Sequence, residues 1–251
     1  MSIFSFTKKV IEKKVEQQTP KAYSIPMGLD LGKVFTISPV VFALVDDSLV
    51  MPTDSRENII CAVSSLKAGN GARVGYRAYV KKGDSDTEPE QYLQVTSDEA
   101  DFECIWFTRL HRHYPQTTED MEAFMGKGYG SGEREFNISR GMLEGLGFDT
   151  KVLDNVYKNE DTLVYTREIG DADYVSPIEQ LETRVDSKDC ESGLTQKSSF
   201  MLYSRILANG TKEFLWISLE VEQSKNGVKS DEVHVDFMVG LKVDSNRIKV
   251  I

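Results

Sequence analysis

The stretch FMLYSRILANGTKEFLWISLEVE, residues 200–222, carries the clearest structural signal of the chain. Two runs rich in apolar and aromatic residues flank the dipeptide formed by Asn209 and Gly210, which tolerates the positive φ that a tight hairpin turn requires. In the second run Phe214 and Trp216 fall on one face of a strand, and the residues on the other face are largely apolar as well. The stretch therefore predicts an antiparallel hairpin in the core, with Trp216 buried.

Strand-like segments outside this hairpin predict that antiparallel β-sheet dominates the chain. Apolar patterns indicate a first hairpin over 34–51, a pair of strands over 73–80 and 91–96, and single strands over 102–110 and 233–243. Both alternating faces of 102–110 are apolar, which is typical of a central strand covered on both sides.

Helical signals are concentrated in the middle of the chain. A helix capped by Thr117 or Thr118 is expected to end at Met125, and a second short helix over 139–146 is expected to end at Gly147. The sequence thus predicts an α+β fold: predominantly antiparallel β-sheet with two short central helices and an N-terminal amphipathic helical arm.

Charge is divided unevenly along the chain. Residues 1–20 carry four Lys and two Glu, a net charge of +2, whereas the whole chain carries 30 basic and 40 acidic residues, a net charge of −10. On a helical wheel the apolar residues of this segment occupy one half and its charged residues the other. The candidate contacts with a membrane or a partner are Phe4, Phe6, Lys8, Lys9, Val10, Ile11 and Lys13. Docking of the helix on its own domain is the alternative.

This pattern, together with the two prolines that follow it, predicts how the chain is divided. We expect a basic amphipathic arm over 1–19, a linker over 20–27 and a β-rich globular body over 28–251. The body is either one domain or two β halves, about 28–115 and 150–251, joined by a helical segment.

The composition of the chain limits the cell compartment and the kinds of partner that we expect for the protein. The acidic balance excludes a general nucleic-acid binder, because non-specific affinity for phosphates requires a basic face. Cys61, Cys104 and Cys190 form no CxxC pair, so we expect a reducing cytoplasm and no disulfide framework. The longest apolar run, 40–45, is far shorter than the roughly 20 residues that cross a bilayer. A cytoplasmic protein is expected, peripheral at the inner membrane if the arm binds lipid.

One basic cluster stands out in the acidic body: Arg109, His111, Arg112 and His113. It could face an anion or a partner, and the alternative is a strand end with solvated basic side chains. In a strand His111 and His113 would share a face and supply two metal ligands, but the spacing indicates no third ligand. We therefore expect no zinc site at these histidines.

The glycine-rich segment GKGYGSG, residues 126–132, invites comparison with phosphate-binding loops. It does not match the Walker pattern, because position 121 is Met and Lys127 is followed by Gly. Ser131 lacks the nucleophile-elbow pattern because position 129 is Tyr. A flexible loop between two short helices is predicted, with a mobile lid over a site as the alternative. The sequence indicates no catalytic residue, cofactor or metal.

Four segments and a Lys-bearing N-terminal tail carry a resemblance to a known family. The segments are GLDLGKVFTISPVVFALVDDSLV at 28–50, YRAYV at 76–80, QYLQV at 91–95 and FECIWFTRL at 102–110. In this layout the chain resembles the YjfK-like proteins, a bacterial family of unknown function. The resemblance implies a cytoplasmic accessory protein without established catalytic residues. Genes of such families tend to lie near a phage-shock-type membrane-stress protein, which implies a helical scaffold at the inner membrane as partner.

Two hypotheses of function follow. The first is a non-enzymatic interaction module, acting at the inner-membrane surface in envelope stress. The alternative is a small-molecule-binding or enzymatic β domain with a pocket near residues 109–113 and 126–132. They differ in what the structure must provide: the second requires a concavity, and the first requires an exposed apolar patch or sheet edge.

Overall fold

The structure, a computed structural model, describes residues 25–52, 57–80, 90–98, 101–187, 193–223 and 232–251. The predicted arm, 1–19, lies outside these residues, as does most of the predicted linker. The described strands are β1 (Val34–Ile37), β2 (Asn58–Ala68), β3 (Arg73–Val80), β4 (Gln91–Asp98), β5 (Asp101–His113), β6 (Glu135–Ser139), β7 (Thr162–Arg167), β8 (Ile178–Val185), β9 (Thr195–Ile206), β10 (Lys212–Gln223), β11 (Val233–Val243) and β12 (Ile248–Val250).

Helical elements are few and short in the described part of the chain. They are α2 (Val40–Ala43), α3 (Thr118–Glu122), α4 (Arg140–Gly145), α5 (Thr150–Tyr157) and the 3-10 turns η1 (Pro26–Gly28) and η2 (Ser245–Arg247). None of these described helices has the length and apolarity needed to cross a membrane.

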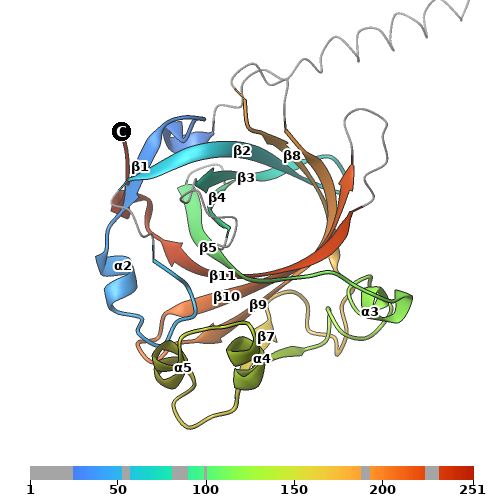
Figure 1. The fold of residues 1–251 in the computed structure, drawn as a ribbon. Coiled ribbons are helices and arrows are strands. Elements are labelled where there is room, and N and C mark those ends of the chain that lie inside the picture. Colours follow the sequence, from blue (N-terminus) through green and yellow to red (C-terminus); the bar gives the residue numbers. More distant parts are fainter. Residues whose placement is uncertain (1–24, 53–56, 81–89, 99–100, 188–192, 224–231) are drawn as a thin grey trace, which may run out of the picture.

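Eight strands close into an antiparallel barrel, seen nearly along its axis in Figure 1. Neighbours pair in the order β2-β3-β4-β5-β11-β10-β9-β8, and the pairing of β8 with β2 completes the circle. Four of these strands come from residues 58–113 and four from residues 178–243. The sheet extends outside the barrel, where β1 and β12 continue from β2 and where β7 and β6 continue from β9.

The α+β fold class predicted from the sequence is wrong, because the sheet closes on itself and the helices are short pieces outside it (Figure 1). Helices do occur near 117–125 and 139–146, as α3 and α4, where the side chains of Thr117 and Ser139 accept hydrogen bonds from backbone N–H groups. Closure depends on β8, whose sequence IEQLETRV lacks apolar alternation because inward side chains such as Glu182 are polar. Without that strand, the remaining pattern predicts antiparallel sheet and short helices but gives no sign that the sheet closes.

The hairpin predicted over 34–51 is also wrong. β1 ends at Ile37, and Pro39 precedes the single turn of α2. Proline has no N–H group to donate to a strand neighbour, so the chain leaves the sheet here. β1 instead pairs with β2 and with the C-terminal β12. Residues 44–51 contain neither helix nor strand.

The hairpin predicted over 200–222 is confirmed as β9 and β10, which pair in register over their whole length. Gly210 has a φ of +83°, and Leu207 N–H donates to the Thr211 carbonyl at 2.8 Å to close the turn. Trp216 is buried, as predicted, with an exposed fraction of 5%. The prediction that 102–110 forms a central strand is confirmed as well, since β5 lies between β4 and β11.

The apolar core is divided by the barrel wall. The larger cluster lies on the outer face of the wall, where β1, β12 and the helices cover it. The smaller cluster lies inside the barrel and is largely aromatic: Trp216 stacks on Phe200 with ring centroids 3.9 Å apart, and Phe107 meets Trp216 edge-on. Gly240 makes room for this cluster, because a Cβ atom there would lie 2.6 Å from the Phe107 ring.

Candidate functional site

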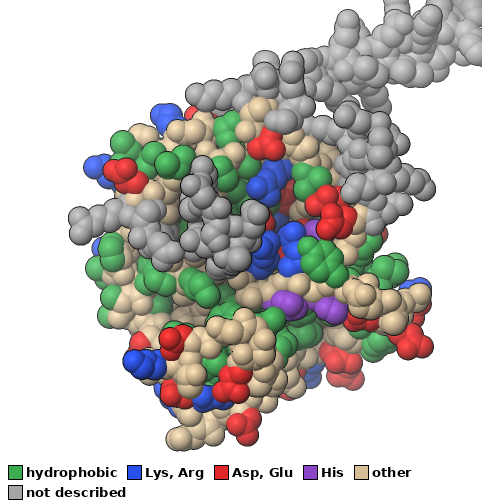
Figure 2. All heavy atoms as spheres, in the orientation of Figure 1, with side chains coloured by type: hydrophobic (Ala, Val, Ile, Leu, Met, Phe, Trp, Pro, Cys, Tyr) green, Lys and Arg blue, Asp and Glu red, His purple; other side chains and the backbone are tan. Residues whose placement is uncertain are grey.

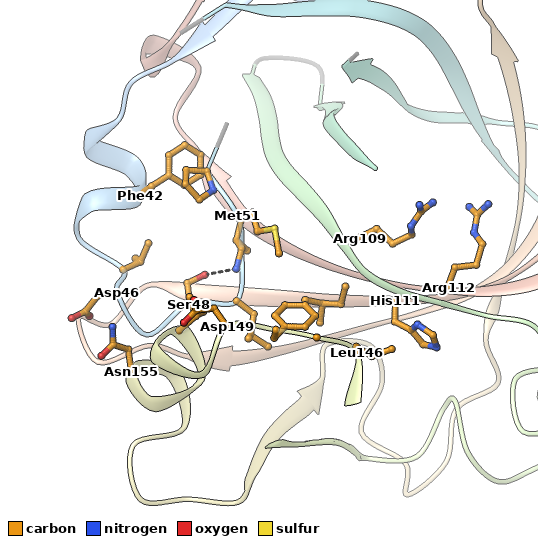
Figure 3. A pocket seen from close by; sticks show the side chains of 18 residues that line it. Phe42, Asp46, Ser48, Met51, Arg109, His111, Arg112, Leu146, Asp149 and Asn155 are labelled. Atoms are coloured by element: carbon orange, nitrogen blue, oxygen red, sulfur yellow. Dashed lines mark hydrogen bonds between the residues drawn. The ribbon is translucent and has the colours of Figure 1, made fainter. Parts of the chain in front are cut away.

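A cleft of about 710 Å³ lies on the outer wall of the barrel, between the end of β5, the segment 42–52 and the α4–α5 connection (Figure 3). Its floor and walls are mainly apolar: Phe42, Leu49, Met51, Leu110, Phe148 and Val152. Its polar lining includes the exposed Asp46, Asp149 and Asn155 at one end and His111 at the other (Figure 3). A cavity of this size and lining is typical of a small-molecule site.

One wall of the cleft is anchored by a buried carboxylate. Glu213 on β10 is fully buried, and it accepts hydrogen bonds from Ser48 Oγ at 2.5 Å and from Leu49 N–H at 2.7 Å. The same carboxylate accepts hydrogen bonds from Tyr165 Oη at 2.6 Å and Arg205 Nε at 2.7 Å. With four donors it is fully satisfied, so its burial is compensated. Segment 44–52 therefore has a fixed conformation although it contains no helix or strand.

A second anchor holds the same wall at Met51. Its carbonyl oxygen accepts hydrogen bonds from Trp106 Nε1 at 3.1 Å, Thr108 Oγ1 at 3.2 Å and Gln91 Nε2 at 3.2 Å. These donors come from neighbouring strands β4 and β5. The cleft is thus largely pre-formed, because its wall over 44–52 is bonded to the barrel at residues 48–49 and again at residue 51.

The opposite wall is the connection between α4 and α5. Leu143 and Leu153 are fully buried and fix both helices to the outer core. Asp149 caps α5 by accepting a hydrogen bond from Lys151 N–H at 2.7 Å. This arrangement leaves Leu146 and Val152 partly exposed, at 38% and 44%, where they line the cleft.

The basic cluster of the sequence is divided between the two faces of β5. A β-bulge opposite Phe237 and Met238 leaves Leu110 without a partner on β11, so the strand's alternation changes phase. In Figure 3 the side chains of Arg109 and Arg112 point to one side of β5 and that of His111 points to the other, although all three residues contribute to the lining of the cleft. The four residues therefore form no single patch.

The two histidines do lie together on the outer face, with ring centroids 6.3 Å apart. His113 Nε2 bonds to Asp120 Oδ2 at 2.8 Å, and this hydrogen bond lowers the pKa of Asp120. Partial burial and the neighbouring His113 lower the pKa of His111. Among the described residues, the one group of side chains close enough to hold a metal comprises Glu220, His234 and Asp236, and it does not include these histidines.

The glycine-rich segment 126–132 does not line the cleft. It connects α3 to β6 rather than to a second helix, so that prediction is wrong. Ser131 is buried, and Gly132 N–H donates to Tyr203 Oη at 2.8 Å. Gly132 has a φ of +116°, and a Cβ atom there would lie 2.3 Å from the Val175 carbonyl oxygen. The glycines therefore serve a tightly packed turn, and the arrangement does not suit a lid.

Sequence reasoning missed the polar half of the barrel interior, although His234 and Asp236 alternate with apolar residues in β11. Asp236 binds the Arg112 guanidinium through both oxygens, at 2.7 and 2.6 Å. Glu220 accepts hydrogen bonds from Gln196 at 2.8 Å and from His234 at 3.2 Å. The carboxylates that a cation would need are thus bonded already, with a guanidinium beside them. The group fits an ion-pair network better than a metal centre.

The fold and the cleft define a closed antiparallel β-barrel with a lateral pocket. The chain belongs to a family described as "Protein of unknown function (DUF2491)", whose model matches residues 6–249. The expectation that the chain belongs to a family of unknown function is therefore confirmed. No curated protein matches the chain, and no solved structure matches it.

Proposed function

We propose that the protein binds a small apolar molecule in the cleft on the outer wall of the barrel. The observation that carries this proposal is a pre-formed, mainly apolar cavity of about 710 Å³, within the range that small-molecule sites occupy. Of the two regions expected to form a pocket, 109–113 contributes and 126–132 does not.

The polar groups of the cleft support binding rather than catalysis. Ser48 is the hydroxyl among the lining residues, and it donates to Glu213, whose carboxylate is saturated by four donors. A general base needs a free lone pair within reach of the proton that it removes. Glu213 has none to offer, so it serves as an anchor.

The charge at the rim indicates the kind of ligand. Asp46 and Asp149 are exposed at one end of the cleft, and the protein as a whole is acidic. Like charges repel across such a rim. This end of the cleft favours a neutral or cationic group of an apolar ligand, whereas Arg109, His111 and Arg112 line the other end.

Val152→Trp is expected to weaken binding of the uncharged fluorescent probe N-phenyl-1-naphthylamine at least about tenfold, because the larger side chain fills the cleft from α5. The matched control is Val164→Trp on β7, since Val164 is similarly exposed, at 47%, and does not line the cleft. Fluorescence titration measures both dissociation constants. Equal affinity in the wild type and Val152→Trp, or no binding at all, would contradict the proposal.

We infer a second candidate function from the sequence of the arm: an interaction module at the inner-membrane surface, as the finer YjfK-like resemblance implies. The observation that favours it is the segregation of apolar and lysine residues over 3–15. A phage-shock-type membrane-stress protein is the partner that this resemblance suggests. The arm would then recruit the barrel to the membrane, in the cytoplasm.

Phe4→Ser combined with Ile11→Ser is expected to abolish sedimentation with anionic vesicles at low salt, because apolar burial supplies most of the attraction. The melting temperature of the body should stay unchanged in the same variant. A fall of several degrees would show instead that the arm docks on its own domain. Absence of vesicle binding in the wild type would refute the membrane role.

A further inference from the structure

Three arginines surround a single carboxylate at the mouth of the barrel. Glu90 lies 3.1 Å from Arg109 Nη1, 3.3 Å from Arg184 Nη1 and 3.9 Å from Arg112 Nη2. In the same region of the barrel a small polar cavity of about 60 Å³ is lined by Arg77, Arg112 and Arg184 and by the carboxylates of Glu90, Glu220, Glu222 and Asp236. Figure 2 shows blue arginine or lysine side chains gathered in this hollow beside acidic ones.

Two of the arginines, Arg112 and Arg184, are held in place by groups other than Glu90. Asp236 fixes Arg112 through two hydrogen bonds, and the Arg184 guanidinium lies 3.9 Å from the centre of the Tyr79 ring. The bulge in β5 matters here, because strict alternation would place Arg109 and Arg112 on opposite faces of the strand. The cluster is therefore organised by the barrel before any anion enters it.

The backbone of Glu90 is fixed as well, since its carbonyl accepts a hydrogen bond from Arg109 N–H at 2.8 Å. Its side chain is 27% exposed, and those of the three arginines are 21–29% exposed. A solute can therefore reach all four groups. The residual cavity is too small for more than about two waters, so a larger ligand must keep its body outside the mouth.

Glu90 supplies the negative charge that pairs with two of these arginines. Among the described residues, Glu90 is the carboxylate that pairs with Arg109 and with Arg184, whereas Arg112 keeps Asp236. Removing the Glu90 charge leaves Arg109 and Arg184 without a salt-bridge partner among the described residues, and the more distant Glu182 is the carboxylate that still acts on Arg184. Guanidinium groups match oxyanions through paired N–H donors.

We propose that the mouth of the barrel is an oxyanion-binding site formed by Arg109, Arg112 and Arg184, in which Glu90 holds the place of a ligand's phosphate or carboxylate group. Arg109 and Arg112 also contribute to the lining of the cleft, but in Figure 3 their side chains point to the side of β5 opposite to that of His111. A ligand anion binds by displacing the Glu90 side chain. This competition lowers the apparent affinity of the wild-type protein for the anion.

The test measures binding of inorganic phosphate and, separately, acetate by isothermal titration calorimetry. Glu90→Gln keeps the shape and removes the competing charge. Its affinity for at least one of the two anions is expected to exceed that of the wild type about tenfold or more, since an occluded site binds in proportion to its open fraction. Preference for phosphate or acetate identifies which oxyanion the ligand carries.

Two further variants separate a built site from a general charge effect. Glu179→Gln makes the same charge change at an exposed ion pair with Lys197 and should leave anion binding at the wild-type level. Adding Arg184→Gln to Glu90→Gln should abolish the gain. If Glu90→Gln does not fold, Glu90→Ala, which also removes the competing charge, should still show increased binding. No gain in any folded Glu90 variant, or an equal gain in Glu179→Gln, overturns the proposal.

Discussion

Trp216→Ala is expected to lower the free energy of unfolding by about 3–5 kcal/mol, the cost of emptying a large buried aromatic site. Trp216 lies inside the barrel with 5% of its surface exposed. Its ring stacks on Phe200 at 3.9 Å with an interplanar angle of 11° and meets Phe107 edge-on at 6.2 Å. Because the strands of the closed wall are all paired, they cannot easily move inward to fill the cavity that the substitution leaves.

Urea unfolding followed by circular dichroism measures this effect as a lower midpoint at similar slope. Ile206→Ala is the matched control on the same hairpin, since Ile206 is 64% exposed and should change stability by less than about 0.5 kcal/mol. Trp216→Phe should fall between the two because it retains a ring for Phe200. An unchanged midpoint for Trp216→Ala would show that the interior cluster does not stabilise the barrel.

The sequence predicted those parts of the fold whose signals are local. The hairpin at Asn209 and Gly210 and the central strand over 102–110 depend on runs of apolar residues and on one turn, and each is visible in a single stretch. The cap at Thr117 is equally local and α3 begins directly after it, while α4 (Arg140–Gly145) lies within the predicted range 139–146.

Barrel closure could not be predicted, because it depends on polar residues that face inward. β8 has Gln180, Glu182 and Arg184 on its interior face, where Glu182 bonds to Arg77 and Arg184 bonds to Glu90, both far away in sequence. A strand of this composition has the pattern of an exposed loop. Only the three-dimensional pairing of β8 with β2 and β9 distinguishes the two.

The geometry of the candidate sites could not be predicted from local sequence patterns either. The basic cluster over 109–113 lies at the end of β5, but the bulge at Leu110 determines on which face of the strand each of its side chains lies. Strict alternation would have grouped Arg109 with the histidines. The cleft wall over 44–52 depends on Glu213 and on the Met51 carbonyl, and these contacts span up to 165 positions in sequence.

Glu182→Gln is expected to destabilise the protein by about 3–5 kcal/mol, because it leaves a buried guanidinium without its counter-charge. Glu182 and Arg77 are 1% and 3% exposed inside the barrel, and their charged atoms lie 2.6 Å apart. Burial alone would lower the pKa of Arg77, but the facing Tyr92 and Glu182 raise it well above its usual value. Because a guanidinium group is not deprotonated in proteins, Arg77 stays charged when Glu182 is neutralised.

Chemical unfolding of three variants isolates this ion pair. Glu179→Gln, which breaks the exposed pair with Lys197, should cost no more than about 1 kcal/mol. Arg77→Met combined with Glu182→Gln should recover part of the loss, because the double variant buries no unpaired charge. Equal stability of Glu182→Gln and Glu179→Gln would mean that water reaches Arg77. The polar interior would then be a solvated channel rather than a sealed network, and the oxyanion site at the mouth would extend into it.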